Sequence, residues 1–203
     1  EAGAKMVPFA GWDMPVWYSS VLEEHQAARQ AAGLFDVTHM GVYEIQGADA
    51  ASFLDSVCAN DIGGLKPGHS CYSHFLTPEA DVIDDTLVYR LSDDRFLVVV
   101  NASNDDKVRA WLENVQAGTV KIDNKRPWAR TYGYNAVIKN LRDPKAGKDM
   151  RVDIALQGPK SLEILLAMSP DKTTKTKLVR LKKTEICNAA IAGFDLIISA
   201  TGY

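Results

Sequence analysis

The sequence predicts an α+β protein in which a ferredoxin-like unit is inserted into a larger mixed, mainly antiparallel β domain. First, residues 42–122 read in the order strand, helix, strands, helix, strand, which is typical of a split βαβ unit. Second, the strand-like segment 152–156 has no obvious partner inside that unit, so it belongs with the flanking chain. We therefore expect a discontinuous first domain, residues 1–43 plus 128–203, and an inserted domain, residues 44–127.

The segment that precedes the unit contains one clear helix. Residues 3–18 combine glycines and prolines with aromatic side chains, which predicts irregular structure held in place by the aromatics. A helix follows, because Ser20 and Glu23 form a capping-box pattern and Gly33 supplies the stop. His25 lies on the apolar stripe of this helix, and we interpret it as a core histidine rather than a ligand.

Inside the unit, short alternating segments predict strands around residues 42–46, 70–76, 82–90, 95–101 and 119–122. Two amphipathic helices interrupt them, the first capped by Asp49 and the second opening at residue 103 or 104. Beyond the unit, Pro159 suits the first position of a helix that runs to residue 168. The basic segment 172–183 is expected to be an exposed loop that leads into a strand.

Composition narrows the class of protein. The chain has 203 residues, 46% of them hydrophobic, with a net charge of −3 and a pI near 5.8. An acidic balance disfavours nucleic acid and membrane surfaces as partners of the whole chain. Cys58, Cys71 and Cys187 form neither a disulfide framework nor a zinc pattern, which indicates a reduced, intracellular protein. No metal-ligand spacing and no membrane-spanning apolar run are visible.

Segment 82–89 carries the best candidate for a reactive residue, because two adjacent carboxylates interrupt an apolar strand. Alternation places Asp85 with Ile83, Leu87 and Tyr89 on the more apolar face, so we predict that Asp85 points inward. A buried carboxylate needs a partner or a changed protonation state, which is typical of functional sites. The alternative is that Asp84 and Asp85 only begin the strand from a solvent-facing turn.

Residues 125–151 form a second candidate, since they contain eight Lys or Arg against two Asp, with Trp128, Tyr132 and Tyr134 between them. Basic residues mixed with aromatics could bind a polyanion. No nucleic-acid motif accompanies them, and we interpret the stretch as a surface insertion held down by its aromatics. Signatures of P-loops, dinucleotide-binding folds, serine hydrolases and zinc proteases are absent from the sequence.

Five colinear segments resemble the glycine cleavage system T-protein family, the aminomethyltransferases. They cover nearly the whole chain in the family's order and lie at residues 3–12, 33–41, 83–85, 156–160 and 201–203. The resemblance implies that a third, β-rich domain of the family is missing from this chain. The chain departs from the family pattern in three places: Ala80 and Asp81 replace a usual Gly-Gly, Ala200 replaces an arginine, and the basic stretch 125–151 is longer than the family's.

The resemblance implies an enzyme of glycine catabolism and one-carbon metabolism. The family takes the aminomethyl group carried on the lipoyl arm of the H-protein, transfers its one-carbon unit to tetrahydrofolate and releases ammonia. Folate and the H-protein would be the partners, without nucleic acid or membrane, in the cytoplasm or a eukaryotic mitochondrial matrix. The alternatives are another folate-dependent demethylase of the superfamily and a non-catalytic folate-binding protein.

The resemblance also assigns site residues. Asp85, the second Asp of the Ile-Asp-Asp motif, would be the catalytic acid, which orients the folate and stabilises positive charge near its N10 atom. The resemblance gives no metal. The folate cavity would also be lined by Met40, Tyr72, Leu87, Tyr89, Asn101 and Tyr203.

Overall fold

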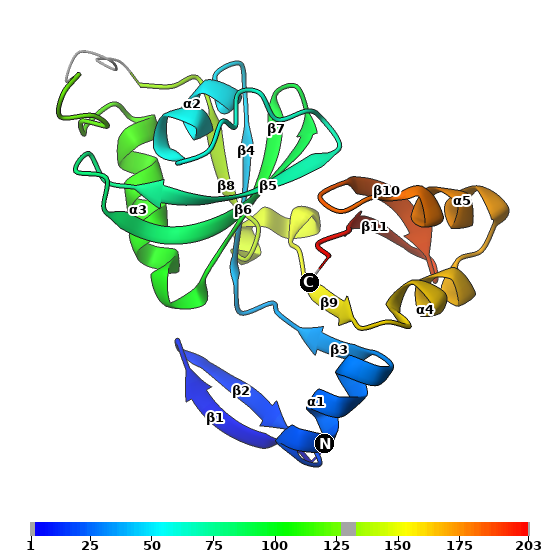
Figure 1. Cartoon of the computed structure of the whole chain (residues 1–203). Coiled ribbons are helices and arrows are strands. Elements are labelled where there is room, and N and C mark those ends of the chain that lie inside the picture. Colours follow the sequence, from blue (N-terminus) through cyan, green and yellow to red (C-terminus); the bar gives the residue numbers. More distant parts are fainter. Residues whose placement is uncertain (1–2, 127–132, 203) are drawn as a thin grey trace. The chain divides into compact units, whose positions relative to one another are not determined.

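The structure is a computed structural model of the chain and describes residues 3–126 and 133–202 (Figure 1). These residues divide into two compact units, which are described separately here. The sheet unit comprises residues 40–126, 133–151 and 184–186, and the flanking unit comprises residues 3–39, 152–183 and 187–202.

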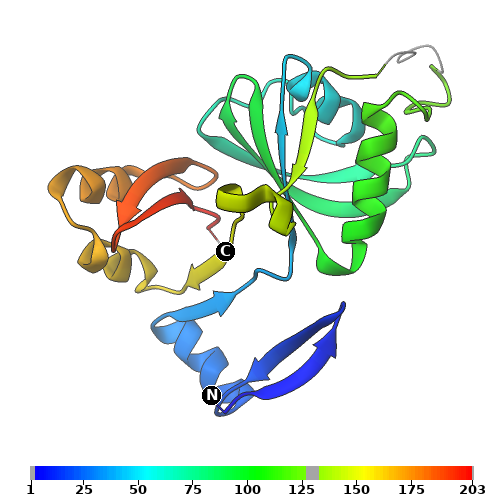
Figure 2. The ribbon, with the colours of Figure 1, turned by 180° about the vertical axis from the view of Figure 1, so that it is seen from behind.

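The sheet unit is built on one antiparallel sheet of five strands. Their order across the sheet is β5-β6-β7-β4-β8. The strands are β4 (Gly41–Gln46), β5 (His69–Leu76), β6 (Val82–Ser92), β7 (Arg95–Val100) and β8 (Val137–Asn140). Helices α2 (Ala50–Val57) and α3 (Asp105–Gln116) pack beside this sheet, as the two opposite views in Figures 1 and 2 show. Two short 3-10 helices, η1 (Ala102–Asn104) and η2 (Pro144–Asp149), complete the unit.

One hydrophobic core joins the two helices to one face of the sheet. The predicted apolar stripes of both helices are confirmed, because Phe53 and Leu54 of α2 and Val108 and Leu112 of α3 are fully buried. They pack with alternate residues of the strands, which are Tyr43, Ile45, Phe75, Val88, Phe96, Val98 and Val100. Since every second strand residue enters this core, the intervening residues lie on the opposite face of the sheet.

The predicted strand at residues 119–122 is wrong. The Thr119 backbone N–H and hydroxyl both donate to the Asn114 carbonyl, at 3.0 Å each, so this segment closes the end of α3 instead of entering a ladder. The strand beside β4 is β8, at residues 137–140. It lies beyond residue 127, so the sheet unit extends past the predicted boundary. The description as an inserted ferredoxin-like domain stays a prediction.

The flanking unit opens with a hairpin where irregular structure was expected. Strands β1 (Lys5–Phe9) and β2 (Trp12–Trp17) pair antiparallel across a turn at Ala10 and Gly11, both of which have positive φ. A two-residue turn of this kind matches the twist of the two strands. The glycine therefore marks a turn between strands, and the proline and aromatic residues lie within them.

Helix α1 (Val21–Gln30) begins as predicted, because the Ser20 hydroxyl accepts the Glu23 N–H at 3.1 Å. Its end at residue 31 lies just before Gly33, the first residue of β3 (Gly33–Asp36). The prediction for His25 is wrong: its side chain is exposed, since α1 has no buried residue in this structure.

The rest of the flanking unit follows from β9 (Ile154–Gln157), which pairs antiparallel with β3. The elements after it are α4 (Ser161–Met168), α5 (Lys172–Arg180), β10 (Ile186–Ile191) and β11 (Phe194–Ser199). Helix α5 replaces the predicted loop at 172–183, because Asp171 caps it by accepting the Thr174 N–H at 2.9 Å. Leu178 of α5 anchors a small core with Ala189 and Ile191. Among the described residues, no helix is long and apolar enough to cross a membrane.

Candidate functional site

The two carboxylates of β6 point to opposite faces of the sheet, but not in the predicted sense. Asp84 is buried, with 3% of its surface exposed, whereas Asp85 is half-buried on the face opposite the helices. The prediction that Asp85 points into the core is therefore wrong. Asp85, Leu87 and Tyr89 do share one face, but a β-bulge removes Ile83 from it: Leu76 pairs with Val82 and Phe75 with Asp84, so Ile83 is an extra residue. Ile83 is therefore buried beside Asp84, and the core side of β6 is the one that carries Asp84, Thr86 and Val88.

Three N–H groups satisfy the buried Asp84 carboxylate. Asn101 donates twice, from its backbone N–H at 2.9 Å and from its side-chain amide at 3.0 Å. The side-chain amide of Asn104 donates at 2.6 Å. Both asparagines belong to the turn that leads from β7 through η1 into α3. Hydrogen bonds to a charged acceptor are strong and compensate its removal from water, so Asp84 fastens this turn to β6.

Asp85 is held from both sides while its carboxylate stays partly exposed. The Asn101 amide Nδ2 donates to Oδ1 of Asp85 at 2.7 Å, and the Tyr72 hydroxyl donates to Oδ2 at 3.0 Å. Tyr72 lies on β5, and its ring meets that of His74 edge to face, with centroids 5.3 Å apart. Because His74 pairs directly with Asp85 in the ladder, one carboxylate, one phenol and one imidazole share a small area.

Five of the residues that the family resemblance assigned meet at this place. Cross-strand register puts Tyr72 opposite Leu87 and Ser70 opposite Tyr89, so their side chains share the face of Asp85. We call this surface the open face and define it by Tyr72, His74, Asp85, Leu87 and Tyr89; Ser70, at its end, is buried and its hydroxyl donates to the Thr184 carbonyl. Asn101 borders it from the end of β7. Apolar and aromatic surfaces with a few fixed polar groups suit a flat polar heterocycle.

The family resemblance also assigns Met40 and Tyr203 to the site, and the structure gives less information about these two residues. Gly41 pairs with Val100, so Met40 lies at the same end of the sheet as Asn101. Its carbonyl accepts the Arg142 Nε–H at 2.8 Å. Tyr203 lies outside the described residues.

Gly41, from the segment 33–41, also serves this end of the sheet. A Cβ at Gly41 would lie 2.2 Å from the Asp105 carboxylate, so a larger residue here would displace the Asp105 side chain at the start of α3. The Tyr43 hydroxyl donates to the same carboxylate. Burial, together with that hydrogen bond, holds the pKa of Tyr43 far above its usual range, so Tyr43 stays a donor. The end of the sheet that carries Asp84 and Asp85 is therefore firmly tied to α3.

The basic stretch is largely tied to its own unit. Lys139 pairs with Asp149 at 2.6 Å, and the Arg142 Nε–H is bonded to the Met40 carbonyl. Tyr134 is 6% exposed and packs on Phe53, as the interpretation of an anchored surface insertion requires. Trp128 and Tyr132, the other two aromatics of this stretch, lie outside the described residues.

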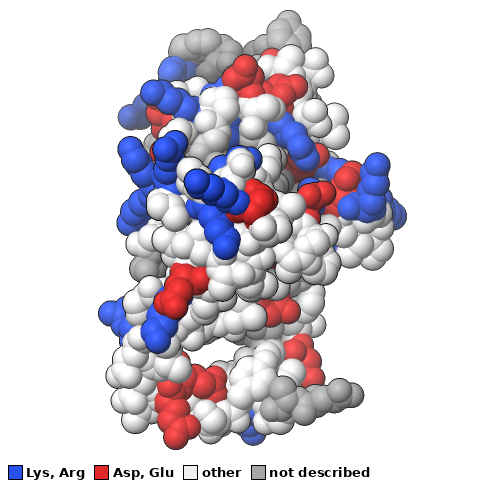
Figure 3. All heavy atoms as spheres, turned by 90° about the vertical axis from the view of Figure 1, so that its right-hand side faces the viewer, with Lys and Arg blue, Asp and Glu red and all other residues white. Residues whose placement is uncertain are grey.

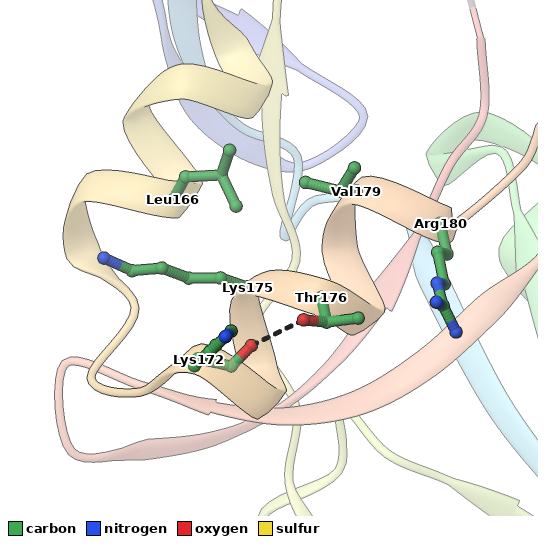
Figure 4. A pocket seen from close by; sticks show the side chains of 6 residues that line it. All are labelled: Leu166, Lys172, Lys175, Thr176, Val179 and Arg180. Atoms are coloured by element: carbon green, nitrogen blue, oxygen red, sulfur yellow. Dashed lines mark hydrogen bonds between the residues drawn. The ribbon is translucent and has the colours of Figure 1, made fainter.

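A hollow lies in the flanking unit, between α4 and α5, with a volume of about 250 Å³ (Figure 4). Its lining is Leu166, Lys172, Lys175, Thr176, Val179 and Arg180. Lys and Arg side chains are prominent on the side of the molecule that Figure 3 shows. The Thr176 hydroxyl donates to the Lys172 carbonyl at 2.8 Å, so it is committed within the helix. Without converging polar groups that fix a ligand, this hollow is a weaker candidate than the open face.

No group of His, Cys, Asp and Glu within residues 3–126 and 133–202 is placed to hold a metal ion. Sequence reasoning missed the role of two residues of the site. Asp84 was assigned to the wrong face, and Asn104 was considered only as a helix start. Asn101 and Asn104 are three residues apart, at the two ends of a single 3-10 turn. This spacing is the pattern that could have revealed these two asparagines as partners of one buried acid.

The turn before β6 contains one of the departures from the family pattern. Ala80 has a φ of 69° where the family usually has glycine. Thr77 holds this turn, because its carbonyl accepts the Ala80 N–H at 2.9 Å and its N–H donates to the Asp81 carbonyl. An alanine in this conformation is strained, since its Cβ approaches the following carbonyl.

Ala80→Gly is therefore expected to raise the free energy of unfolding by about 0.5–1 kcal/mol, after the greater entropy of glycine in the unfolded chain is subtracted. Urea denaturation would measure this. Ala110→Gly, at an exposed position of helix α3, is the matched control and should lower stability by about 1 kcal/mol. Equal losses for both variants would contradict a strained turn.

These features define a class before any comparison: an α+β protein with antiparallel sheets and a half-exposed carboxylate set among aromatic residues. The whole chain, residues 1–203, matches the family model described as the GCVT N-terminal domain, and the chain belongs to this family. The predicted family resemblance is thereby confirmed.

Named relatives agree with this assignment. The chain is 40% identical to the aminomethyltransferase of Desulforamulus reducens over 202 residues, which is 100% of this chain and 48% of that protein. It is 37% identical to the aminomethyltransferase of Bacillus subtilis, covering 100% of this chain and 49% of that protein. The chain thus spans about half the length of the curated relatives it matches.

A solved structure agrees as well. The glycine cleavage system aminomethyltransferase T from Bartonella henselae superposes with a TM-score of 0.71 at 33% identity, over 91% of this chain and 44% of that one. The coarse fold prediction, mixed α and β structure with antiparallel sheets, is therefore confirmed.

Proposed function

We propose that the chain carries the folate site of a glycine cleavage system aminomethyltransferase. The enzyme would move the one-carbon unit of an aminomethyl-lipoyl H-protein to tetrahydrofolate and release ammonia, in the cytoplasm or in a eukaryotic mitochondrial matrix. One observation carries the proposal: the half-exposed Asp85 carboxylate is fixed by Tyr72 and Asn101 on a face that also presents Leu87 and Tyr89. Membership of the family and its aminomethyltransferase relatives support it.

The proposed aminomethyl transfer requires a negative charge beside a carbon that becomes electron-deficient. When the aminomethyl carbon leaves its nitrogen or sulfur partner, positive charge develops on an iminium-like centre. A carboxylate that is already oriented stabilises this charge without reorganising. Asp85 meets that requirement, because its two oxygens are each held by one donor and the side chain is still partly exposed.

The remaining work of the site is positioning. Tyr72, Leu87 and Tyr89 offer aromatic and apolar surface against which a pterin ring could lie, and Asn101 offers an amide at its edge. Holding folate next to the lipoyl-bound carbon removes an entropic barrier, which is worth about 7 kcal/mol or more in well-oriented cases. The lipoyl arm would come from the H-protein, which is the proposed protein partner.

Calorimetry with tetrahydrofolate tests the proposal directly. The full-length protein should bind tetrahydrofolate, and the same sample should form methylenetetrahydrofolate from aminomethyl-lipoyl H-protein. Leu87→Arg should weaken folate binding at least about 10-fold, because a charged chain would occupy apolar contact surface on the open face.

Val137→Arg is the matched control, since Val137 is exposed on β8 at the far edge of the same sheet and should leave affinity unchanged. Absence of folate binding in the wild type would refute the folate site. Binding without turnover would instead favour the demethylase or the non-catalytic alternative.

A further inference from the structure

The side chain of Asn101 is shared by two carboxylates. Its Nδ2 lies 3.0 Å from Oδ1 of Asp84 and 2.7 Å from Oδ1 of Asp85. A primary amide has two N–H groups in one plane and a single carbonyl oxygen. Each N–H therefore serves one carboxylate, and the carbonyl Oδ1 must point away from both.

Both bonds are needed to fix this orientation. A single bond to Asp85 would let the amide turn about that bond and change where its oxygen points. The second bond, to Asp84, defines the amide plane. A flipped amide would bring its oxygen against two carboxylates, which is strongly unfavourable. Asp84 thus fixes the orientation of the Asn101 side-chain amide at the edge of the open face.

Asp84 is itself prevented from moving. It is 3% exposed, and its other donors are the Asn101 backbone N–H at 2.9 Å and the Asn104 side chain at 2.6 Å. All three donors come from one turn, so the hydrogen bonds that hold this carboxylate lead to the edge of the site. A side chain that only filled the core could be apolar and avoid the cost of burying a charge.

We propose that Asp84 and Asn104 are positioning residues that lock the Asn101 carboxamide. In that orientation the Asn101 Nδ2 holds Asp85 in place. The carbonyl Oδ1 of Asn101 then faces an N–H group of the bound ligand, such as that of a reduced pterin ring or of its linking amine. The proposal rests on the proposed folate site. It goes beyond that site by assigning a task to a buried acid that touches no ligand.

Asp84→Asn tests this proposal. An asparagine at position 84 has only one oxygen, so its own NH2 group would face at least one of the three N–H donors that the carboxylate now accepts. The KM for tetrahydrofolate is expected to rise about 10-fold, with a smaller change in kcat. Combining Asp84→Asn with Asn104→Asp restores one donor and one acceptor and should recover part of the affinity. Ser73→Ala is the control, since Ser73 is equally buried, accepts the Asn60 N–H at 3.1 Å and does not touch Asn101. It should lower stability without changing KM.

A double-mutant cycle separates positioning from plain stabilisation. If Asp84 acts through Asn101, Asp84→Asn adds no further loss of folate affinity once Asn101→Ala is present. Fully additive losses would overturn the proposal.

A second measurement does not depend on folate. By NMR, the Asn101 side-chain amide protons should exchange slowly with solvent in the wild type and at least about 10-fold faster in Asp84→Asn. Unchanged exchange would overturn the lock even if folate binds. If folate fails to bind the wild type, the proposed function falls, while the exchange result still decides whether Asp84 orients Asn101.

Discussion

Asp85→Asn is expected to lower kcat for aminomethyl transfer by about 10²–10³-fold, which is the range seen when one preorganised electrostatic group is removed from an active site. The reason is the loss of a full negative charge beside the carbon that becomes iminium-like. The open face keeps its shape, because asparagine has nearly the same volume as aspartate. Single-turnover transfer from aminomethyl-lipoyl H-protein to tetrahydrofolate, measured on the full-length protein, would isolate this step from product release.

Stability should change far less than turnover. Asp85 is half-buried and keeps at least one of its two hydrogen bonds as an amide, so the free energy of unfolding should stay within about 1 kcal/mol of the wild type. Asp81→Asn, in the exposed turn just before β6, controls for the loss of a charge nearby and should keep normal turnover. If both variants had equal turnover, Asp85 would have no special role.

Tyr72 allows the charge and its orientation to be separated. Tyr72→Phe keeps the ring against the open face and keeps the Asp85 charge, but it removes the 3.0 Å hydrogen bond to Oδ2. Its effect on kcat should therefore fall between those of the wild type and Asp85→Asn. This ordering would indicate that orientation contributes in addition to charge.

Much of the fold was predictable where one local pattern decides the structure. Helices α2 and α3 were predicted correctly because their apolar stripes face one core. Helix α5 was missed because its sequence is mostly Lys and Thr, and what holds it is the Asp171 cap together with the burial of Leu178. Strand β8 was missed for a different reason: its partner β4 lies about 90 residues earlier, and that pairing leaves no local signal.

The site shows the same division between local and non-local information. Cross-strand neighbours of Asp85 on β5 and β6 follow from alternation along regular strands. The depth of each acid did not, because Ile83, which made the Asp85 side look more apolar, is an inserted residue that lies buried beside Asp84 instead. A bulge depends on the partner strand and cannot be read from the bulged strand alone. The pairing of Asp84 with Asn104 likewise depends on the path of a turn 20 residues away.

The largest expected loss of stability in the flanking unit comes from Gly158, the glycine of the segment 156–160. Its φ is +121°, and a Cβ there would lie 2.5 Å from the Ala28 carbonyl oxygen and 2.6 Å from that of Ala31. The Ala31 carbonyl is also the acceptor of the Lys160 N–H, at 2.9 Å. The chain thus passes from β9 to α4 across the end of α1 at a distance that only glycine permits.

Gly158→Ala is therefore expected to cost at least about 3 kcal/mol, because unfavourable φ and a clash with rigid backbone add together. Gly193→Ala is the matched control in the same unit: Gly193 also has positive φ, +84°, but a Cβ there meets nothing within 4 Å. It should cost only about 1 kcal/mol, which is the conformational part alone. Amide hydrogen exchange in β3 and β9, whose pairing joins Gly33 to Gln157, would report the loss locally. If the two variants cost the same, close packing at Gly158 would not matter, and its positive φ alone would explain the glycine in this segment.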